Sequence, residues 1–323
     1  MKKIIFSVLL IGCISASLDF IKSHNTFSGS VVAGILELHK FKSEIFNNSR
    51  YLRILLPSDY YDKKNKNTKY KVLYMNDGQN LFEKETSVFN PMEWEIDETL
   101  EKLSSKHKIE PIIVVGIDNA GKRQRPNEYL PWEDEYLEPP YPNPNGRHYP
   151  DFLINEVIPF INAHYRVRQG PVNTGLGGSS YGGLITLYTA IKKPDIFGFI
   201  LIESPSFYVN KRAILDMARE FSAWPEKIYL GVGTNELGLK NCVQTDGNRE
   251  PVQDVQEFFH ILVKNGVSKD RIHLVIEKCA LHNEAAWARR FPKATLFWQP
   301  KEIQSKKTKE MTINNFFMFT PPF

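Results

Sequence analysis

One serine in the chain lies in a setting typical of an enzymatic nucleophile. Residues 175–183 read Gly-Leu-Gly-Gly-Ser-Ser-Tyr-Gly-Gly and contain a G-x-S-x-G pattern from Gly178 to Gly182, with Ser180 at its centre. A β-prone stretch precedes this pattern, and a helical pattern follows from Leu184. On a sharp turn between a strand and a helix, small neighbours let the backbone bend tightly and leave the serine hydroxyl exposed. Ser180 is the candidate nucleophile; the competing interpretation is a glycine-rich turn that binds an anion.

A nucleophilic serine needs a base and an acid that orients the base. In α/β-hydrolases the acid and then the histidine follow the serine in the chain, each after a strand. His282 lies just past the final predicted strand, and Glu236 lies just past the strand before it. Because of this order, His282 is the predicted base and Glu236 the predicted acid, although a single histidine usually has a structural role. Glu203 and Asp246 remain alternatives for the acid.

The chemistry also needs donors for an oxyanion. One donor is expected to be the backbone N–H of Tyr181, directly after the nucleophile. The second is expected from the loop after the third predicted strand, 76–80, where Gly78 allows a tight turn and the N–H of Gln79 can point inward. An ordinary Asp-Gly turn is the alternative interpretation of this loop.

The elements that must position these residues follow from hydrophobic periodicity. Short apolar runs alternate with helical patterns, which is typical of an α/β fold. Strands are expected at 34–41, 51–56, 71–75, 112–115, 172–176, 197–202, 228–232 and 272–276. Helices are expected at 94–103, 151–161, 184–193, 213–221, 252–263 and 284–298, with Asp151 as the cap of the second. Gly and Pro content does not shift sharply, so one domain is predicted over 30–300.

The segment 129–150 is a long loop that follows the predicted strand 112–115. It contains six prolines and five large aromatic residues, including Trp132 and Tyr136. Long loops of this kind are usually functional or disordered, and the aromatic content favours function. Loops at the carboxyl end of a parallel sheet face the ligand site. Trp132 and Tyr136 are therefore predicted to line the mouth of the Ser180 pocket.

Composition excludes some classes of protein. The formal net charge is +4 and the basic residues are spread along the chain, so nothing indicates nucleic-acid binding.

The N-terminus has two lysines, an apolar run at 4–12 and small residues after it, which predicts a signal peptide over 1–17 and export of the protein. Leu10 to Cys13 also resembles a lipobox, so a lipid anchor on Cys13 is an alternative to a free secreted form. The Lys-rich residues 301–323 are expected to form a tail.

The cysteines and histidines carry the remaining signals. In an oxidising compartment Cys242 and Cys279 can form a disulfide, and two separate buried thiols are the alternative. The eight histidines show no metal-binding spacing, and no C-x-x-C pattern occurs. No metal site is predicted.

Taken together, these motifs resemble the esterase branch of the α/β-hydrolase superfamily, which includes esterase D, enterochelin esterases, and feruloyl and acetyl-xylan esterases. The matching stretches, in the order of that family, are 74–82, 114–118, 125–129, 178–183, 203–207, 233–236 and 282–287. The resemblance implies a mostly parallel central sheet with helices on both faces. It also implies the triad Ser180, His282 and Glu236, where the family often has Asp as the acid, and it implies no cofactor.

The resemblance further implies a serine carboxylester hydrolase that forms an acyl-enzyme. Candidate substrates are acyl esters of carbohydrates and siderophore-type esters. For an anionic siderophore, Lys122, Arg123 and Arg125 could meet the negative charge; the alternative for Arg125 is a structural pair with Glu128. A catalytically silent relative that binds carbohydrate is the competing function.

Overall fold

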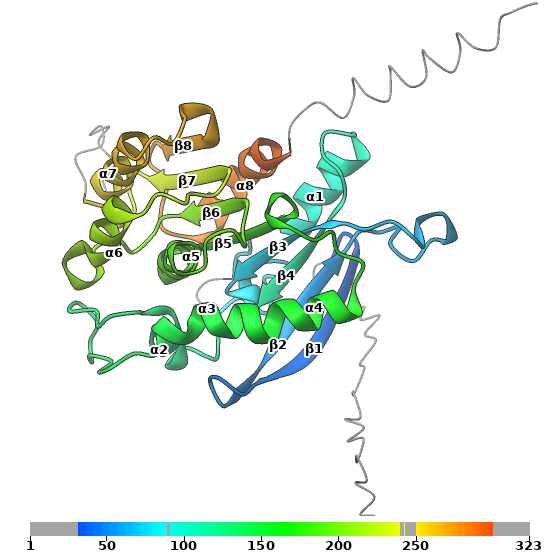
Figure 1. Ribbon diagram of the computed structural model, residues 1–323, viewed down its shortest axis with the longest axis horizontal. Helices are drawn as coiled ribbons and strands as arrows, with labels where there is room; N and C mark the ends of the chain where they lie inside the picture. Colours follow the sequence, from blue (N-terminus) through cyan, green and yellow to red (C-terminus); the bar gives the residue numbers. More distant parts are fainter. Residues whose placement is uncertain (1–31, 89–90, 240–241, 243–249, 300–323) are drawn as a thin grey trace, which may run out of the picture.

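The computed structural model describes residues 32–88, 91–239, 242 and 250–299 of the chain. Eight strands form one sheet in the order β1-β2-β4-β3-β5-β6-β7-β8 (Figure 1). The strands are β1 (Ile35–Ser43), β2 (Asn48–Leu56), β3 (Lys71–Asn76), β4 (Ile112–Ile117), β5 (Thr174–Ser179), β6 (Phe199–Glu203), β7 (Lys227–Gly233) and β8 (Ile272–Glu277). The helices are α1 (Ile96–Ser105), α2 (Gln124–Tyr129), α3 (Tyr149–Phe152), α4 (Ile158–His164), α5 (Tyr181–Lys192), α6 (Val209–Glu220), α7 (Glu250–Lys264) and α8 (Glu284–Trp298).

The sheet is mostly parallel. β1 pairs with β2 and β2 pairs with β4 in antiparallel fashion, whereas every pair from β4 through β3 to β8 is parallel. Parallel strands need a crossover between them, and the helices supply it. The predicted α/β-hydrolase architecture is confirmed.

Successive side chains of a strand point to opposite faces of the sheet, and here both faces are apolar. In β3, Val72 and Tyr74 belong to one core cluster, which also contains side chains of α3 to α7, while Leu73 and Met75 belong to a second cluster with α1 and α8. Helices therefore cover both faces, as the ribbon shows (Figure 1). The central strands are buried on both sides, which explains their nearly continuous apolar sequences.

The site is positioned where the strand order reverses. The chain leaves β3 to form β4 on one side of it and later returns to form β5 on the other side. The turns after β3 and β5 therefore diverge at the same edge of the sheet, where ligands bind in open α/β folds. Ser180 and Gln79 lie in these two turns.

Most predicted elements agree with the structure in type, and α8 agrees at both ends. β5 starts two residues later than expected, because Pro171–Asn173 form a 3-10 turn before it. The helix predicted to start at Asp151 begins at Tyr149, so the predicted cap is wrong. Pro150 lies in the first turn, where its missing N–H costs nothing and its fixed φ favours the helix.

Some predictions fall outside the described residues: the signal peptide 1–17, the lipid anchor at Cys13 and the tail 301–323. Among the residues that the structure describes, no helix is long and apolar enough to cross a membrane.

Candidate active site

The turn at Ser180 has the strained geometry expected of a nucleophile. β5 ends at Ser179 and α5 begins at Tyr181, and Ser180 between them has φ 59° and ψ −126°. A non-glycine residue in such a conformation costs about 1–3 kcal/mol, so the surroundings must hold it. They do so through the Ser180 N–H, which donates to the Glu203 carbonyl at 3.0 Å. Gly178 is required, since a Cβ there would lie 2.8 Å from the carbonyl carbon of Gly182.

Two backbone N–H groups border this turn without a hydrogen bond inside the part of the chain that the structure describes. One belongs to Tyr181, the first residue of α5, and the other to Gln79 in the short 3-10 turn η2 (Gly78–Asn80). The first N–H groups of a helix have no partner within it and favour negative charge. Gly78 packs so tightly that a Cβ would lie 2.5 Å from the backbone of Gly116. Both predicted oxyanion donors are thus in turns that leave their N–H groups available.

His282 and Glu236 meet at the carboxyl ends of the last two strands. The Nδ1 atom of His282 lies 2.6 Å from Oε2 of Glu236. The other carboxylate oxygen, Oε1, accepts from Ser204 Oγ at 2.7 Å and from the Gly233 N–H at 2.5 Å. The Glu236 side chain is 4% exposed, whereas that of His282 is 37% exposed. A buried carboxylate bonded to Nδ1 fixes the tautomer that leaves Nε2 as a proton acceptor.

The electrostatics of Glu236 favour its charged form. Burial alone would raise the pKa of its carboxyl group, but four interactions outweigh burial and lower the pKa. They are the hydrogen bond from His282, the His282 charge, the Gly233 N–H and the Ser204 hydroxyl. Ser204 is in turn oriented by Trp287, whose Nε1 donates to Ser204 Oγ at 3.0 Å. The carboxylate beside His282 is therefore ionised at neutral pH.

The hydroxyl of Ser180 contacts Ser206, not His282. The two hydroxyl oxygens are 3.5 Å apart, and no hydrogen bond joins Ser180 to His282 among the described residues. Catalytic hydrogen bonds are often long in free enzymes and shorten when substrate binds.

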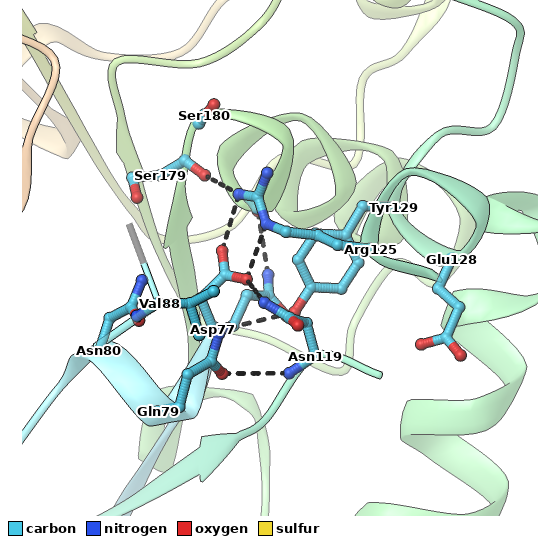
Figure 2. A network of polar contacts seen from close by, with 12 residues as sticks. Asp77, Gln79, Asn80, Val88, Asn119, Arg125, Glu128, Tyr129, Ser179 and Ser180 are labelled. Carbon is cyan, nitrogen blue, oxygen red and sulfur yellow. Dashed lines mark hydrogen bonds and ion pairs between the residues drawn. The ribbon is translucent and has the colours of Figure 1, made fainter. Parts of the chain in front are cut away.

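At the start of η2, Arg125 and Asp77 form a buried ion pair (Figure 2). The Arg125 guanidinium donates from Nε and from one terminal nitrogen to the two Asp77 oxygens, each at 2.8 Å. The same guanidinium lies 3.5 Å from the Ser179 carbonyl, so it bridges η2 and the nucleophile turn. Asn119 completes the network: its side-chain amide donates to Asp77 at 2.7 Å, and its N–H donates to Gln79 Oε1 at 3.2 Å.

Arg125 thus has a structural partner, but a different one from the alternative considered in the sequence. The Glu128 carboxylate pairs with Arg50 at 2.6 Å instead. Burial would lower the pKa of Arg125, but the Asp77 carboxylate raises it. Its charge is therefore compensated inside the protein. Lys122 and Arg123, which lie just before α2, are exposed.

The loop 129–150 is anchored to the nucleophile turn through Asp134. The Tyr181 hydroxyl donates to Asp134 Oδ2 at 2.5 Å, and the Tyr208 hydroxyl lies 3.3 Å from the same oxygen. Tyr136 is 71% exposed and packs edge-on against Tyr208. Trp132 is half-buried and packs edge-on against Tyr188 of α5. The structure places this loop next to the residue after Ser180, with Tyr136 as its open aromatic side chain.

Glu203, one of the alternative acids, is occupied elsewhere. It is fully buried and pairs with Arg290, whose terminal nitrogen lies 2.7 Å from its Oε2. Burial raises the Glu203 pKa against the opposing effect of Arg290. The other alternative, Asp246, lies outside the described residues.

The predicted disulfide between Cys242 and Cys279 is confirmed. The two sulfurs are bonded and the Cα atoms are 5.6 Å apart. Cys279 follows β8 and also donates its N–H to Thr234 Oγ1 at 2.8 Å, next to the turn that carries Glu236. The bridge therefore joins the loop that carries the acid to the loop that carries the histidine.

Sequence reasoning did not single out four residues of this site: Asn119, Asp134, Ser204 and Ser206. Ser204 and Ser206 lie in the family-like stretch 203–207, which was the available signal. Asp134 lies in an irregular loop and acts through a partner 47 residues away, so no local spacing could reveal it.

The eight-stranded sheet with a strained serine between β5 and α5, followed by an acid after β7 and a histidine before α8, defines the α/β-hydrolase class. A model of the Putative esterase family matches residues 43–298. The chain belongs to this family, and it is an enzyme of the carboxylic ester hydrolase type.

Individual relatives and solved structures are similar to the chain. The uncharacterised protein YbbA of Bacillus subtilis is 25% identical over 246 residues, which is 76% of this chain and 90% of YbbA. The solved enterochelin esterase of Shigella flexneri is 18% identical with a TM-score of 0.62 over 84% of this chain and 60% of its own. A solved ferulic acid esterase is 17% identical with a TM-score of 0.60 over 83% of this chain and 99% of its own. At these identities the structural matches show the shared fold.

Proposed function

We propose that the protein hydrolyses carboxylic esters through an acyl-enzyme on Ser180, with His282 as base and Glu236 as the acid that orients it. The observation that carries this proposal is the 2.6 Å contact between His282 Nδ1 and the buried Glu236 carboxylate, in loops that follow β8 and β7. This contact leaves Nε2 of His282 as the proton acceptor on the edge of the sheet where Ser180 lies.

The reaction has two halves. Ser180 Oγ attacks the ester carbonyl carbon while His282 Nε2 takes the hydroxyl proton, and the N–H groups of Tyr181 and Gln79 hold the oxyanion. The tetrahedral intermediate then collapses, and His282 gives its proton to the departing alcohol. A water molecule, deprotonated by His282, attacks the acyl-enzyme and releases the acid and the free serine. The two halves together consume only the ester and one water molecule, so the reaction needs no cofactor.

We further propose that the substrate is a bulky, polar ester. The anchored loop 129–150 presents Tyr136 at the rim, and aromatic rings supply a large contact area for sugars and aromatic acids. Acyl esters of carbohydrates fit this rim. Siderophore-type esters fit it as well, with the exposed Lys122 and Arg123 available for their negative charge, because Arg125 is already paired.

The test is a panel of esters with matched variants. Ser180→Ala and His282→Ala should each lower kcat by about 10⁴–10⁶-fold, and the double variant should be hardly worse, since the residues act as a unit. Ser105→Ala, an exposed serine at the end of α1, is the control. Near-wild-type turnover in Ser180→Ala would refute the mechanism. Absence of turnover by the wild type on every ester, with retained sugar binding, would favour the silent carbohydrate-binding relative.

The panel contains p-nitrophenyl acetate, a feruloylated sugar and a catecholate trilactone. Tyr136→Ala should raise KM for the preferred bulky ester several-fold more than for p-nitrophenyl acetate, because only the bulky group reaches the rim. Equal effects on both would remove Tyr136 from the binding site.

We also propose that the protein is exported. The Cys242–Cys279 disulfide supports this, because such bonds persist in oxidising compartments. The N-terminal mass of the mature protein distinguishes cleavage before Cys13, which would leave a lipid anchor, from cleavage after Ala16 or Ser17. An uncleaved N-terminus on protein recovered from the cytoplasm would contradict export.

A further inference from the structure

Three carboxylates converge at the start of α1, outside the proposed catalytic residues. Asp97 and Glu98 lie in the first turn of the helix, and Glu93 lies in the segment before it. One carboxylate oxygen of each residue lies within 4.8 Å of the other two. Like charges at this spacing repel, so their convergence needs an explanation.

Burial makes this convergence more costly. Asp97 is only 1% exposed; its Oδ2 accepts from the Ala33 N–H at 2.7 Å, whereas its Oδ1 is buried with no hydrogen-bond donor among the described residues. Oε2 of Glu93 is also buried and has no hydrogen-bond partner among the described residues. Buried polar atoms nearly always have partners, because an unpaired one costs about 1–3 kcal/mol.

No positive side chain compensates the group. Within the described residues, none of the three carboxylates forms an ion pair with Lys, Arg or His. Burial raises the pKa of Asp97 to about 8, and Glu98 adds to the increase. Burial likewise raises the pKa of Glu93 to about 7, with Glu98 and Glu95 contributing. The charges that act on Glu93 belong to Glu83, Glu85, Glu95 and Glu98, which are all acidic.

We infer that Glu93, Asp97 and Glu98 bind a divalent cation of the calcium type. Ca²⁺ takes oxygen ligands at about 2.3–2.6 Å, so two oxygens on one ion lie at most about 5 Å apart, and the three carboxylate oxygens lie within that limit of one another. Mg²⁺ at about 2.0–2.1 Å requires oxygens within about 4.2 Å and near-ideal octahedral geometry. The exposed side of Glu98 leaves room for water to complete the coordination.

The site would act on structure, because its segment is bonded to two other parts of the fold. The N–H groups of Trp94 and Ile96 donate to the carbonyls of Asn80 and Leu81, at 3.1 and 3.4 Å. Asn80 is the last residue of η2, the turn that carries the Gln79 N–H. Through Asp97 the site also holds Ala33, just before β1. A bound cation would therefore fix the segment that is hydrogen-bonded to the end of η2.

The experiment uses the mature full-length chain, stripped with EDTA and kept at constant ionic strength. Calorimetric titration with CaCl₂ should give one site with Kd of about 10⁻⁴–10⁻³ M, as in extracellular modules. At 5 mM CaCl₂ the Tm should rise by about 2–6 °C. Asp97→Asn and Glu98→Gln should abolish the binding heat and the Tm increase. Glu101→Gln, one turn further along α1 and outside the group, should retain both.

Two outcomes would overturn the inference. One is the absence of a binding heat and of a Tm increase in the wild type; if Asp97→Asn then raises the Tm without calcium, the carboxyl groups share a proton instead. The other is an equal calcium response in wild type and Glu98→Gln, which indicates general surface binding. Glu98 is exposed, so this variant decides the question even if Asp97→Asn does not fold. Both readouts are independent of esterase turnover.

Discussion

The two sides of Ser180 are built differently. One side, here called the oxyanion side after its proposed role, is buried throughout and joined by a bidentate ion pair; it is made of Asp77, Gln79, Asn119 and Arg125. The histidine side, made of Glu236 and His282, lies in loops at the sheet edge, and His282 is 37% exposed.

This difference separates two tasks. Donors to an oxyanion act best when they are already oriented, so that no reorganisation occurs during the reaction. A base must change partner, first accepting the serine proton and then donating it to the alcohol, so some freedom of the ring is useful. Under the proposed mechanism, the more buried and more connected side of the site is the one where charge would develop.

The largest effect is expected from removing Arg125, whose guanidinium is the buried positive charge of the oxyanion side. Arg125→Met leaves the Asp77 carboxylate buried and unpaired, which should lower the free energy of unfolding by about 3–5 kcal/mol. Turnover of the folded fraction should also fall, because Arg125 joins η2 to the Ser179 carbonyl. Urea unfolding and kcat on p-nitrophenyl acetate measure the two effects.

The matched control is Arg289→Met, which removes an arginine that is 56% exposed and paired with Glu277. Exposed pairs contribute about 0–1 kcal/mol. Similar losses in the two variants would show that burial does not distinguish the oxyanion side.

The next variant tests the histidine side. Glu236→Gln removes the carboxylate that fixes the His282 tautomer, and kcat should fall by about 10²–10³-fold, less than in Ser180→Ala. The pKa of Glu236 is lowered by folding, so the stabilisation it gives is present above its ordinary pKa and is lost as pH falls through the lowered value.

The difference in unfolding free energy between wild type and Glu236→Gln should therefore be largest near pH 7 and shrink towards pH 3. Urea unfolding at both pH values measures it. A difference that stays constant with pH would show that the interactions of the ionised carboxylate do not stabilise the fold.

The smallest change in turnover is expected from the disulfide. Replacing both Cys242 and Cys279 by Ser should lower the free energy of unfolding by up to about 4 kcal/mol, since the bridge closes a separation of 37 residues. Because a bridge acts mainly on the unfolded chain, kcat should change only a few-fold. Wild type treated with reductant should behave like the double variant; a loss of kcat above tenfold would mean that the bridge positions His282.

Chain order in the sequence singled out the candidate catalytic residues, and the structure brings two of them, His282 and Glu236, into contact. Ser180 was recognisable because a short glycine-rich pattern lies between a strand and a helix. His282 and Glu236 were recognisable because each follows a predicted strand. All eight strands could be found because they are apolar and short, although Asp151 was wrongly taken as a cap.

The partners of Arg125 and Asp134 could not be predicted. A charge three residues away on a helix favoured a local pair with Glu128, but tertiary packing brought Asp77 closer, from 48 residues away. The same packing gave Glu128 to Arg50. Pairing of buried charges depends on which side chains share a volume, and a linear pattern does not contain that information.

Tyr181 links two properties that protein engineers usually vary separately. Its backbone N–H is the proposed oxyanion donor, while its side-chain hydroxyl holds Asp134 of the loop 129–150 at 2.5 Å. Mutations in this loop that are meant to change substrate selectivity can therefore also disturb Tyr181, which directly follows Ser180 in the chain. Tyr181→Phe keeps the N–H and the ring and removes only this hydrogen bond to the loop, so it should separate the two roles of the residue.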